Sequence, residues 1–347
     1  MDNEARILLN GCWDLAHVGH FNALRQVAKL RDELYPEGKV IAGIHANEEI
    51  ARVKGGSFIY TDSEKLEMLR ACNWVDDVIE NVPYVPVTPD FLDKDFVSCA
   101  IAVHGDDPVI LADGTDMYRP VREAGRYAEI RRSEGVSTTS LINRILTFLQ
   151  EPGDLKNRED SGFQATGMRF AEFYKSSRTR LTIQHSSTVV YLAGHFDLFH
   201  PGHVEVLRRA SKLGDFLLVG LLAQPDSVAF LTDSERALSL LACRYVGDVV
   251  LEAPDLPSSD FVSAFNVSKI VHVVGHDDFQ NTLIGPDLTG SDLAGPDVEL
   301  IDASDIRMSK AVVIGRVLAN INAFKSRNKK KINPPLKPVC HNRFLTA

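Results

Sequence analysis

The chain has 347 residues, of which 44% are hydrophobic and 24% are charged, and its formal net charge at pH 7 is −9. These values indicate a globular protein of about two domains and exclude a protein that binds nucleic acid through an overall positive charge. The five cysteines contain no CxxC pair, which argues against a zinc ribbon and a disulfide framework. We find neither a signal-peptide pattern nor an apolar run of the roughly 20 residues that crossing a bilayer requires, and therefore expect a cytoplasmic protein.

Apolar runs and amphipathic segments alternate through the first 150 residues. Short apolar runs predict strands, and apolar positions that recur every three or four residues predict helices. Thr61 followed by Glu64 is a capping box, which marks the start of one helix. We expect strands over 6–12, 39–45, 76–82 and 99–105, and helices within 17–30 and over 61–72 and 138–150.

The same succession returns in the second half of the chain. The segments TDSEKLEMLRACNWVDDVI (61–79) and TDSERALSLLACRYVGDVV (232–250) are too similar for chance, which indicates an internal duplication. Strands that alternate with helices predict a doubly wound parallel sheet, with the ligand crevice at the carboxyl ends of the strands. The expected fold class is therefore α/β, with two tandem Rossmann-like doubly wound parallel-sheet domains. We expect these domains at 1–150 and 188–325, a linker with one short helix at 151–187, and a basic tail at 326–347.

Two histidines three residues apart, His17 and His20, follow the first predicted strand. Both rings then lie over the first turn of the next helix, and Gly19 lets a ligand approach the backbone. A helix N-terminus offers free N–H groups and a partial positive charge to phosphate, and imidazole can donate to phosphate oxygens. A zinc site needs further ligands, which the neighbouring sequence does not supply. The pattern therefore favours a polyphosphate pocket.

Several segments together resemble the cytidylyltransferases of the HxGH nucleotidyltransferase superfamily. The tandem arrangement resembles the branch of that family that acts on phosphoethanolamine, because the choline branch has one catalytic domain followed by a membrane-binding helix. The resemblance implies two nucleotidyltransferase domains that transfer CMP from CTP to phosphoethanolamine, giving CDP-ethanolamine and pyrophosphate for phospholipid synthesis, with Mg²⁺ accompanying CTP. The segments are GCWDLAHVGH (11–20), HANEEIARVKGG (45–56), LRACNWVDDVI (69–79), VHGDD (103–107), DGTDMY (113–118) and AGRYAEIRRSEGVSTTSLINRIL (124–146).

The resemblance also implies roles for individual residues. His17 and His20 would stabilise charge on the α-phosphate and on the departing pyrophosphate. Lys54 would bridge the phosphates of the two substrates, and Arg132 would reach the β- and γ-phosphates. The nucleotide would contact Gly11, Cys12, Asp14, His17, His20, Gly105, Asp106, Asp107, Arg132, Gly135, Ser137, Thr138 and Thr139. Besides Lys54, the acceptor substrate would contact Trp74, Asp113 and Tyr118 as the walls of the pocket for its amine, because an ammonium group favours aromatic faces and a carboxylate. No protein side chain is implied as a metal ligand.

The second copy keeps the HxGH motif at His200 and His203 but lacks other parts of the pattern. Its loop after the second strand is shorter and has no lysine, and IDASDIRMSKAVVIGRVL (301–318) replaces the segment RSEGVSTT. We therefore expect catalysis in the first domain alone. Two interpretations of the second domain stay open: a packing scaffold, or a vestigial nucleotide site at Gly194, His200, His203 and Gly275.

Other functions remain as alternatives. They are the same transfer to phosphocholine or glycerol 3-phosphate, and a nucleotide-binding regulatory protein without turnover. The segment RMSK (307–310) beside an HxGH motif suggests an aminoacyl-tRNA synthetase, but the chain lacks the connective region and anticodon-binding extension of such enzymes. The expected partners are the small molecules CTP and phosphoethanolamine, with no nucleic acid and an open oligomeric state. The basic run KSRNKKK (325–331) leaves peripheral association with the endoplasmic reticulum membrane open.

Overall fold

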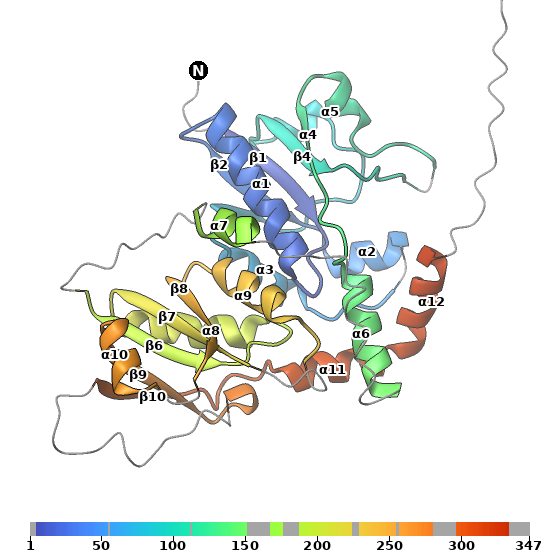
Figure 1. Cartoon of the computed structure of the whole chain (residues 1–347). Coiled ribbons are helices and arrows are strands. Elements are labelled where there is room, and N and C mark those ends of the chain that lie inside the picture. The colour runs from blue at the N-terminus through green and yellow to red at the C-terminus, as the bar shows by residue number, and fades with distance from the viewer. Residues whose placement is uncertain are drawn as a thin grey trace, which may run out of the picture.

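The computed structural model describes residues 5–54, 56–111, 113–150, 167–175, 187–223, 229–254, 257–279 and 296–332. These residues form two α/β domains of the same plan (Figure 1). Domain one is drawn blue to green, and domain two is drawn yellow to red.

Domain one has a sheet in the order β3-β2-β1-β4-β5, in which every neighbouring pair is parallel. Both faces of the central strand β1 are buried, which explains its continuous apolar sequence, ILL. Ile7 of β1 pairs with Val40 on one side and Ile101 on the other, so the strand order reverses at β1 and opens a crevice there. The elements are β1 (Arg6–Gly11), α1 (Val18–Leu34), β2 (Lys39–Ile44), α2 (Asn47–Lys54), α3 (Asp62–Arg70), β3 (Asp77–Ile79), α4 (Pro89–Leu92), β4 (Ile101–Gly105), α5 (Arg119–Glu123), β5 (Tyr127–Ile130) and α6 (Thr138–Gln150).

Domain two repeats this topology in a parallel sheet of order β10-β9-β6-β7-β8. The expected fold class is therefore confirmed. The elements are α7 (Gly167–Lys175), β6 (Val189–Gly194), α8 (Pro201–Ala210), η2 (Ser211–Leu213), β7 (Phe216–Leu222), α9 (Asp233–Leu241), β8 (Asp248–Ala253), α10 (Ser259–Ala264), β9 (Val267–Val274), η3 (Asp277–Phe279), β10 (Asp297–Asp302), α11 (Lys310–Ala319) and α12 (Ile321–Ile332).

Local capping explains where the two equivalent helices α3 and α9 begin. Thr61 and Glu64 form the predicted capping box, and Thr232 and Glu235 form the same box in domain two. Helix α7 lies within the expected linker, the rest of which, 151–166 and 176–186, is outside the described residues. The expected start of a tail at residue 326 falls inside α12, which continues to Ile332.

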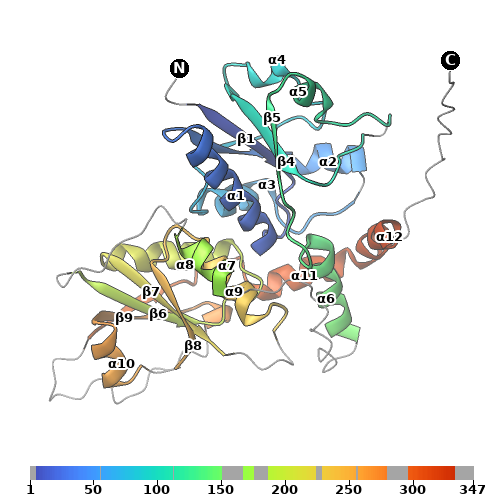
Figure 2. The same ribbon diagram turned by 45° about the horizontal axis from the view of Figure 1, so that its top comes forward.

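The two domains meet in an approximately two-fold arrangement, in which equivalent segments contact each other. Cys72 and Cys243 form an antiparallel β-bridge, and the Asn73 N–H donates to the carbonyl oxygen of Ala242 at 2.8 Å. Buried apolar side chains from both domains belong to one continuous hydrophobic cluster. Figure 2 shows α11 reaching from domain two to lie beside α6 of domain one, where the two helices are in contact.

Two arginine–glutamate pairs join the domains in a reciprocal manner. The Arg144 guanidinium of α6 donates to both carboxylate oxygens of Glu235, at 2.7 and 3.0 Å. The Arg316 guanidinium of α11 donates to both carboxylate oxygens of Glu64, at 2.6 and 2.9 Å. Each domain therefore contacts, through α6 or α11, the capping box of the other.

In the part of the chain that the structure describes, no helix combines the length and the apolar character needed to cross a membrane.

Candidate active site

The first HxGH motif forms the N-terminus of α1. His17 is the N-cap, in an extended conformation, and its Nδ1 accepts a hydrogen bond from the Gly19 N–H at 3.1 Å. The His17 and His20 rings stack with their centroids 3.9 Å apart and an interplanar angle of 25°. The three-residue spacing thus brings the two imidazoles together over one helical turn, as the sequence predicts.

Both imidazoles are neutral at pH 7. Burial lowers the pKa of His17 well below its ordinary value of 6.5, and the nearby His20 and Arg132 lower it further. Burial and the charge of Arg132 lower the pKa of His20 to about 4. Because the His17 Nδ1 accepts a hydrogen bond, the neutral ring carries its proton on Nε2. His17 can therefore donate a hydrogen bond from Nε2 without carrying charge.

A pocket of about 270 Å³ lies beside these rings, at the crevice where the strand order of domain one reverses. It brings together residues from β1, α1, β4 and the segment that leads from β5 into α6. Of the predicted site residues, the pocket is lined by Gly11, His17, His20, Gly105, Asp107, Arg132, Ser137, Thr138 and Thr139. Asp106 and Gly135 line a second, more open hollow, which shares Arg132 and Ser137 with this pocket.

Three hydroxyl residues at the N-terminus of α6 line the pocket: Ser137, Thr138 and Thr139. Ser137 and Ser140 cap each other: the Ser137 N–H donates to the Ser140 hydroxyl at 2.8 Å, and the Ser140 N–H donates to the Ser137 hydroxyl at 3.1 Å. The Thr138 hydroxyl donates to the carbonyl oxygen of Asp14 at 3.0 Å, which ties α6 to the turn before α1. Two helix N-termini therefore border one pocket, an arrangement that suits a polyanion.

Arg132 is held at the rim by two acidic residues. Its Nη1 lies 2.9 Å from the Asp107 carboxylate, and its backbone N–H donates to the Asp106 carboxylate at 3.0 Å. The Arg132 and Asp107 side chains are both about half exposed, at 54% and 48%. The guanidinium can therefore exchange this partner for a phosphate at small cost, because exposed ion pairs contribute little.

Asp14 does not line the pocket, although the sequence suggested contact with the nucleotide. It is buried, and its Oδ1 accepts hydrogen bonds from the backbone N–H groups of Ile59 and Tyr60, at 3.0 and 2.8 Å. The carboxylate therefore fixes the segment after the Lys54 loop against the turn that precedes α1. Cys12 is partly exposed in that turn and is not among the pocket-lining residues.

The residues expected around the amine are dispersed. Trp74 is fully buried in the core and packs edge-to-face on Phe173 of α7, with centroids 5.2 Å apart, so its expected role as a pocket wall is wrong. Asp113 is exposed, and its carboxylate accepts the Thr115 N–H in a surface turn away from the pocket. Tyr118 is buried and stacks on His104, which lines the pocket. Lys54 is the last residue of α2, and its side chain is outside the described part of the structure.

Asn10 and Trp13 are among the pocket-lining residues that the sequence did not single out. Asn10, near the end of β1, is buried, and its side-chain amide has no hydrogen-bond partner within the described residues. Trp13 donates from Nε1 to the carbonyl oxygen of Gly43 at 2.8 Å and tilts against the His20 ring. A polar residue closing an apolar strand was the available signal for Asn10, whereas Trp13 reads from sequence as core.

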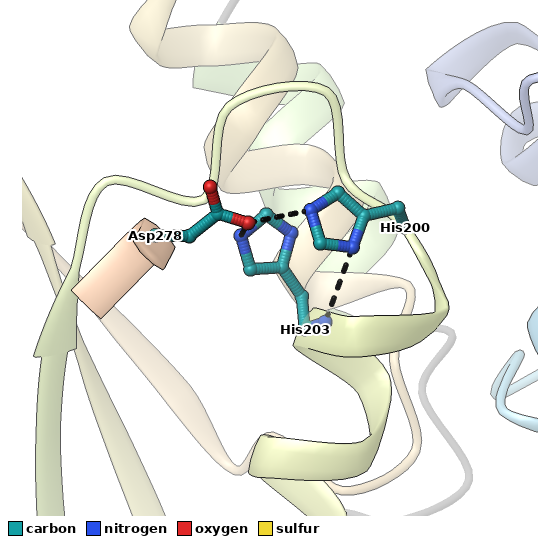
Figure 3. A group of neighbouring side chains, drawn as sticks. All are labelled: His200, His203 and Asp278. Atoms are coloured by element: carbon teal, nitrogen blue, oxygen red, sulfur yellow. Dashed lines mark hydrogen bonds and ion pairs between the residues drawn. The ribbon is translucent and has the colours of Figure 1, made fainter. Parts of the chain in front are cut away.

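The second HxGH motif has the same backbone but a different neighbour (Figure 3). His200 and His203 stack with centroids 3.8 Å apart, and the His203 N–H donates to the His200 Nδ1 at 3.4 Å. The His200 Nε2 lies 2.8 Å from the Asp278 carboxylate, which points at the ring in the figure. The same carboxylate accepts the Lys310 N–H at 3.0 Å. His200 and His203 are 0% and 1% exposed. The second HxGH motif is therefore buried, with a carboxylate of the chain itself as its hydrogen-bond partner.

The comparisons with known proteins agree with the duplication and the motif. A family model described as cytidylyltransferase-like matches residues 8–144 and 191–294. The ethanolamine-phosphate cytidylyltransferases of Arabidopsis thaliana and Mus musculus are 36% and 33% identical to this chain; each alignment covers 94% of it, and 83% and 89% of the relative. A probable choline-phosphate cytidylyltransferase of Schizosaccharomyces pombe is 39% identical, over 41% of this chain and 37% of its own length. The chain belongs to the cytidylyltransferase-like family, together with the ethanolamine-phosphate cytidylyltransferases that it matches across both domains.

Proposed function

We propose that this enzyme transfers CMP from CTP to phosphoethanolamine, giving CDP-ethanolamine and pyrophosphate. The observation that carries the proposal is the pocket of domain one, where the neutral HxGH imidazoles and the N-terminus of α6 face the same space. The relatives that match both domains are named for the ethanolamine substrate, whereas the choline-phosphate relative matches 41% of the chain. This difference supports phosphoethanolamine over phosphocholine.

The reaction is an in-line displacement at the α-phosphorus of CTP. An oxygen of the phosphoethanolamine phosphate forms the new bond to that phosphorus. The bond from the α-phosphorus to the oxygen that bridges to the β-phosphate breaks, and pyrophosphate leaves with the electron pair. Because the attacking phosphate oxygen is already anionic, no general base is needed, and catalysis rests on positioning and charge stabilisation.

The role that we assign to the HxGH pair is hydrogen-bond donation to developing negative charge. A neutral Nε2–H on His17 meets the α-phosphate, and His20 meets the departing pyrophosphate. Ser137, Thr138 and Thr139 place their hydroxyls and the N-terminal N–H groups of α6 beside the triphosphate. Gly11 and Gly105, at the strand ends, leave room for the nucleoside.

Cations complete the proposed site. Lys54 is assigned to the repulsion between the two anionic substrates, and Arg132 to the β- and γ-phosphates, which accept its fork of N–H donors. Among the described residues that line the pocket, Asp107 is the carboxylate, and it is paired with Arg132. The donor set therefore fits Mg²⁺ carried by the triphosphate itself, where the ion neutralises phosphate charge, without a protein ligand.

The amine and the cellular location are parts of the same proposal. Tyr118 is buried and does not itself line the pocket, so its assignment to the ammonium rests on its stacking against the pocket residue His104. We place the enzyme in the cytoplasm, with peripheral contact to anionic lipid of the endoplasmic reticulum through the lysines of 325–331. Co-sedimentation with anionic vesicles, compared with a chain in which these lysines are glutamine, tests the contact; equal sedimentation of the two chains would remove it.

A substrate competition tests the function. Phosphoethanolamine, phosphocholine and glycerol 3-phosphate are offered together at equal concentration with CTP and Mg²⁺, and the CDP products are separated and counted. We expect CDP-ethanolamine to exceed the other two products by on the order of tenfold or more. A free-energy difference of about 1.4 kcal/mol, the order of one polar contact, already corresponds to a factor of ten. A dominant CDP-choline or CDP-glycerol would assign a different acceptor. CTP binding without any product would indicate a regulatory protein.

A further inference from the structure

We propose that Asp278 is a built-in ligand of the second HxGH motif, and that its carboxylate occupies the position that a nucleotide phosphate takes in domain one. The Asp278 carboxylate accepts hydrogen bonds from an imidazole and from a helix N-terminus. Asp278 accepts from His200 Nε2 at 2.8 Å and from the Lys310 N–H, the first residue of α11, at 3.0 Å. An HxGH imidazole and a helix N-terminal N–H are the same kinds of donor that domain one presents to its pocket.

Both domains carry two acidic residues just after the strand beside the HxGH strand, Asp106 and Asp107 in domain one and Asp277 and Asp278 in domain two. The Asp107 carboxylate lies 2.9 Å from Arg132 at the rim of the pocket, whereas the Asp278 carboxylate lies 2.8 Å from His200. Among the described contacts, the hydrogen bond between a carboxylate and an HxGH imidazole is therefore a feature of domain two. Burial raises the pKa of Asp278, but the His200 hydrogen bond and the neighbouring His203 outweigh this effect, so that the pKa lies well below the ordinary range and the group is anionic.

Other parts of the chain occupy the space around the second HxGH motif. A Cβ built on Gly202 would overlap the carbonyl oxygen of Met308, whereas one on Gly19 meets the equivalent segment at Val136, 3.0 Å away. The amino group of Lys310 turns inward to Asp197, at 2.7 Å. An anion, a cation and a backbone segment of the chain thus fill the second site from within.

A divalent metal is the alternative occupant, because ligand atoms of His200, His203 and Asp278 lie within 4.8 Å of one another. The geometry favours the internal ligand. The His200 Nδ1 accepts a hydrogen bond from a backbone N–H, so the proton of the neutral ring is on Nε2. This Nε2–H donates a hydrogen bond to Asp278, and the nitrogen therefore has no lone pair for a metal. The His203 Nδ1 is buried without a hydrogen-bond partner in the described residues, although metal-bound imidazoles almost always have one there.

Calorimetric titration with CTP and with inorganic pyrophosphate tests this proposal. We expect one binding event per chain in the natural protein and in the control Asp277→Ala, which alters an exposed neighbouring carboxylate. Asp278→Ala should gain a second event, and Asp278→Asn, which keeps the shape and loses the charge, a weaker one. Folded Asp278 variants that both bind only as the natural protein does would overturn the proposal. So would stoichiometric Zn²⁺ binding that is retained in Asp277→Ala and lost in Asp278→Ala. No event in the natural protein with one in Asp278→Ala would refute the proposed function of domain one and support this inference.

A separate observation concerns what domain two does for domain one. We infer that Arg316 of α11 is a positioning residue for the loop that follows Lys54, the last residue of α2, an inference that rests on the proposed function. Besides pairing with Glu64, the Arg316 Nη1 donates to the carbonyl oxygen of Ile59 at 2.7 Å. The N–H of the same residue, Ile59, donates to Asp14 beside the HxGH turn. Arg316 and Asp14 therefore hold one peptide segment from its two sides.

Tyr60 supplies a second link to domain two at the same place. Its hydroxyl donates to the carbonyl oxygen of Phe199 at 3.0 Å, and its N–H donates to Asp14. Only four residues of chain lie between Lys54 and Ile59, so fixing Ile59 and Tyr60 limits the space that the lysine can sample. The mirror contact, from Arg144 to the carbonyl oxygen of Phe230 at 3.3 Å, holds the loop of domain two, which has no lysine.

This mirror symmetry provides a matched control. Arg316→Met and Arg144→Met remove equivalent cross-domain pairs, and we expect similar losses of thermal stability. Arg316→Met should also lower kcat by on the order of tenfold, with partial recovery in Arg316→Lys, whereas Arg144→Met should retain kcat within about twofold, because a loss of positioning acts on the transition state. Arg144 also contributes to the lowered pKa of His17, so Glu235→Gln, which breaks the same pair from domain two, is a second control.

Two results would overturn the inference. One is an equal loss of kcat in Arg316→Met and in both controls, which would mean a general effect of stability. The other is unchanged hydrogen exchange of the amides of residues 56–60 in Arg316→Met, a measurement that does not depend on the substrate. If the natural protein transfers no cytidylyl group, the exchange result still decides the positioning, and the proposed function alone fails.

Discussion

The neutral state of His20 makes the stability of the protein depend on pH in a calculable way. The pKa of His20 is about 4 in the folded chain against 6.5 ordinarily. Between these values the unfolded chain binds a proton that the folded chain refuses, so folding stability rises with pH across this window and is lost as the pH falls below 6.5. At pH 5 the window has been entered by 1.5 units, which at 1.36 kcal/mol per unit corresponds to about 2 kcal/mol as an upper value, because the ring borders the pocket.

Replacing His20 by Asn removes this term. Urea unfolding of the natural protein and of His20→Asn, each at pH 8 and pH 5, gives four free energies of unfolding, and we expect the natural protein to lose about 2 kcal/mol more on acidification than the variant. The carboxylates cancel in this double difference, because both proteins carry them. His20 suits the experiment better than His17, whose ring caps α1. A double difference below about 0.5 kcal/mol would refute the claim that His20 is held neutral by its surroundings.

Three catalytic predictions follow from the proposed roles. His20→Ala should lower kcat by on the order of a hundredfold or more, the usual loss for one charge-stabilising donor, and near-normal turnover would contradict the assignment. Lys54→Ala should lower kcat and raise the KM for phosphoethanolamine, while Arg52→Ala, an exposed cation on the same helix, should change neither; equal behaviour of the two variants would remove Lys54 from the site. Arg132→Ala should raise the KM for CTP by on the order of tenfold, as expected for a lost charge-assisted contact, with Arg119→Ala, an exposed cation on α5, as the control; an unchanged KM would show that Arg132 does not reach the phosphates.

Local signals explain what could be predicted from the sequence. The capping box at Thr61 and Glu64, the apolar run of β1 and the HxGH spacing each depend on residues close together in the chain, and each has its expected structure. The prediction that Trp74 forms a pocket wall is wrong because its neighbours in sequence are compatible with both a core position and a pocket position. Its partner Phe173, on α7, decides between them, and the sequence does not reveal that contact.

Contacts between distant residues account for most of what was missed. Arg316 is 252 positions from Glu64, and no periodic pattern indicates that they pair. Asp278, in η3, and Lys310, in α11, are 32 positions apart in the sequence. The carboxylate meets the HxGH motif because the fold brings η3 and the start of α11 to the same turn. Asp14 was recognised as part of the motif, but its role as a backbone clamp depends on where residues 59 and 60 return to the turn.

The hydrophobic cluster that runs through both domains has a thermodynamic consequence. Side chains such as Trp74 and Phe199 are buried in this shared cluster, so unfolding of either half exposes apolar surface of the other. The two halves should therefore unfold as one cooperative unit, as a dimer does, but without its dependence on protein concentration. Because the two copies lie in one chain, each is present at a fixed effective concentration for the other, and no association step is needed. The second copy could then lose its own pocket while its contribution to the fold of the first remained secured.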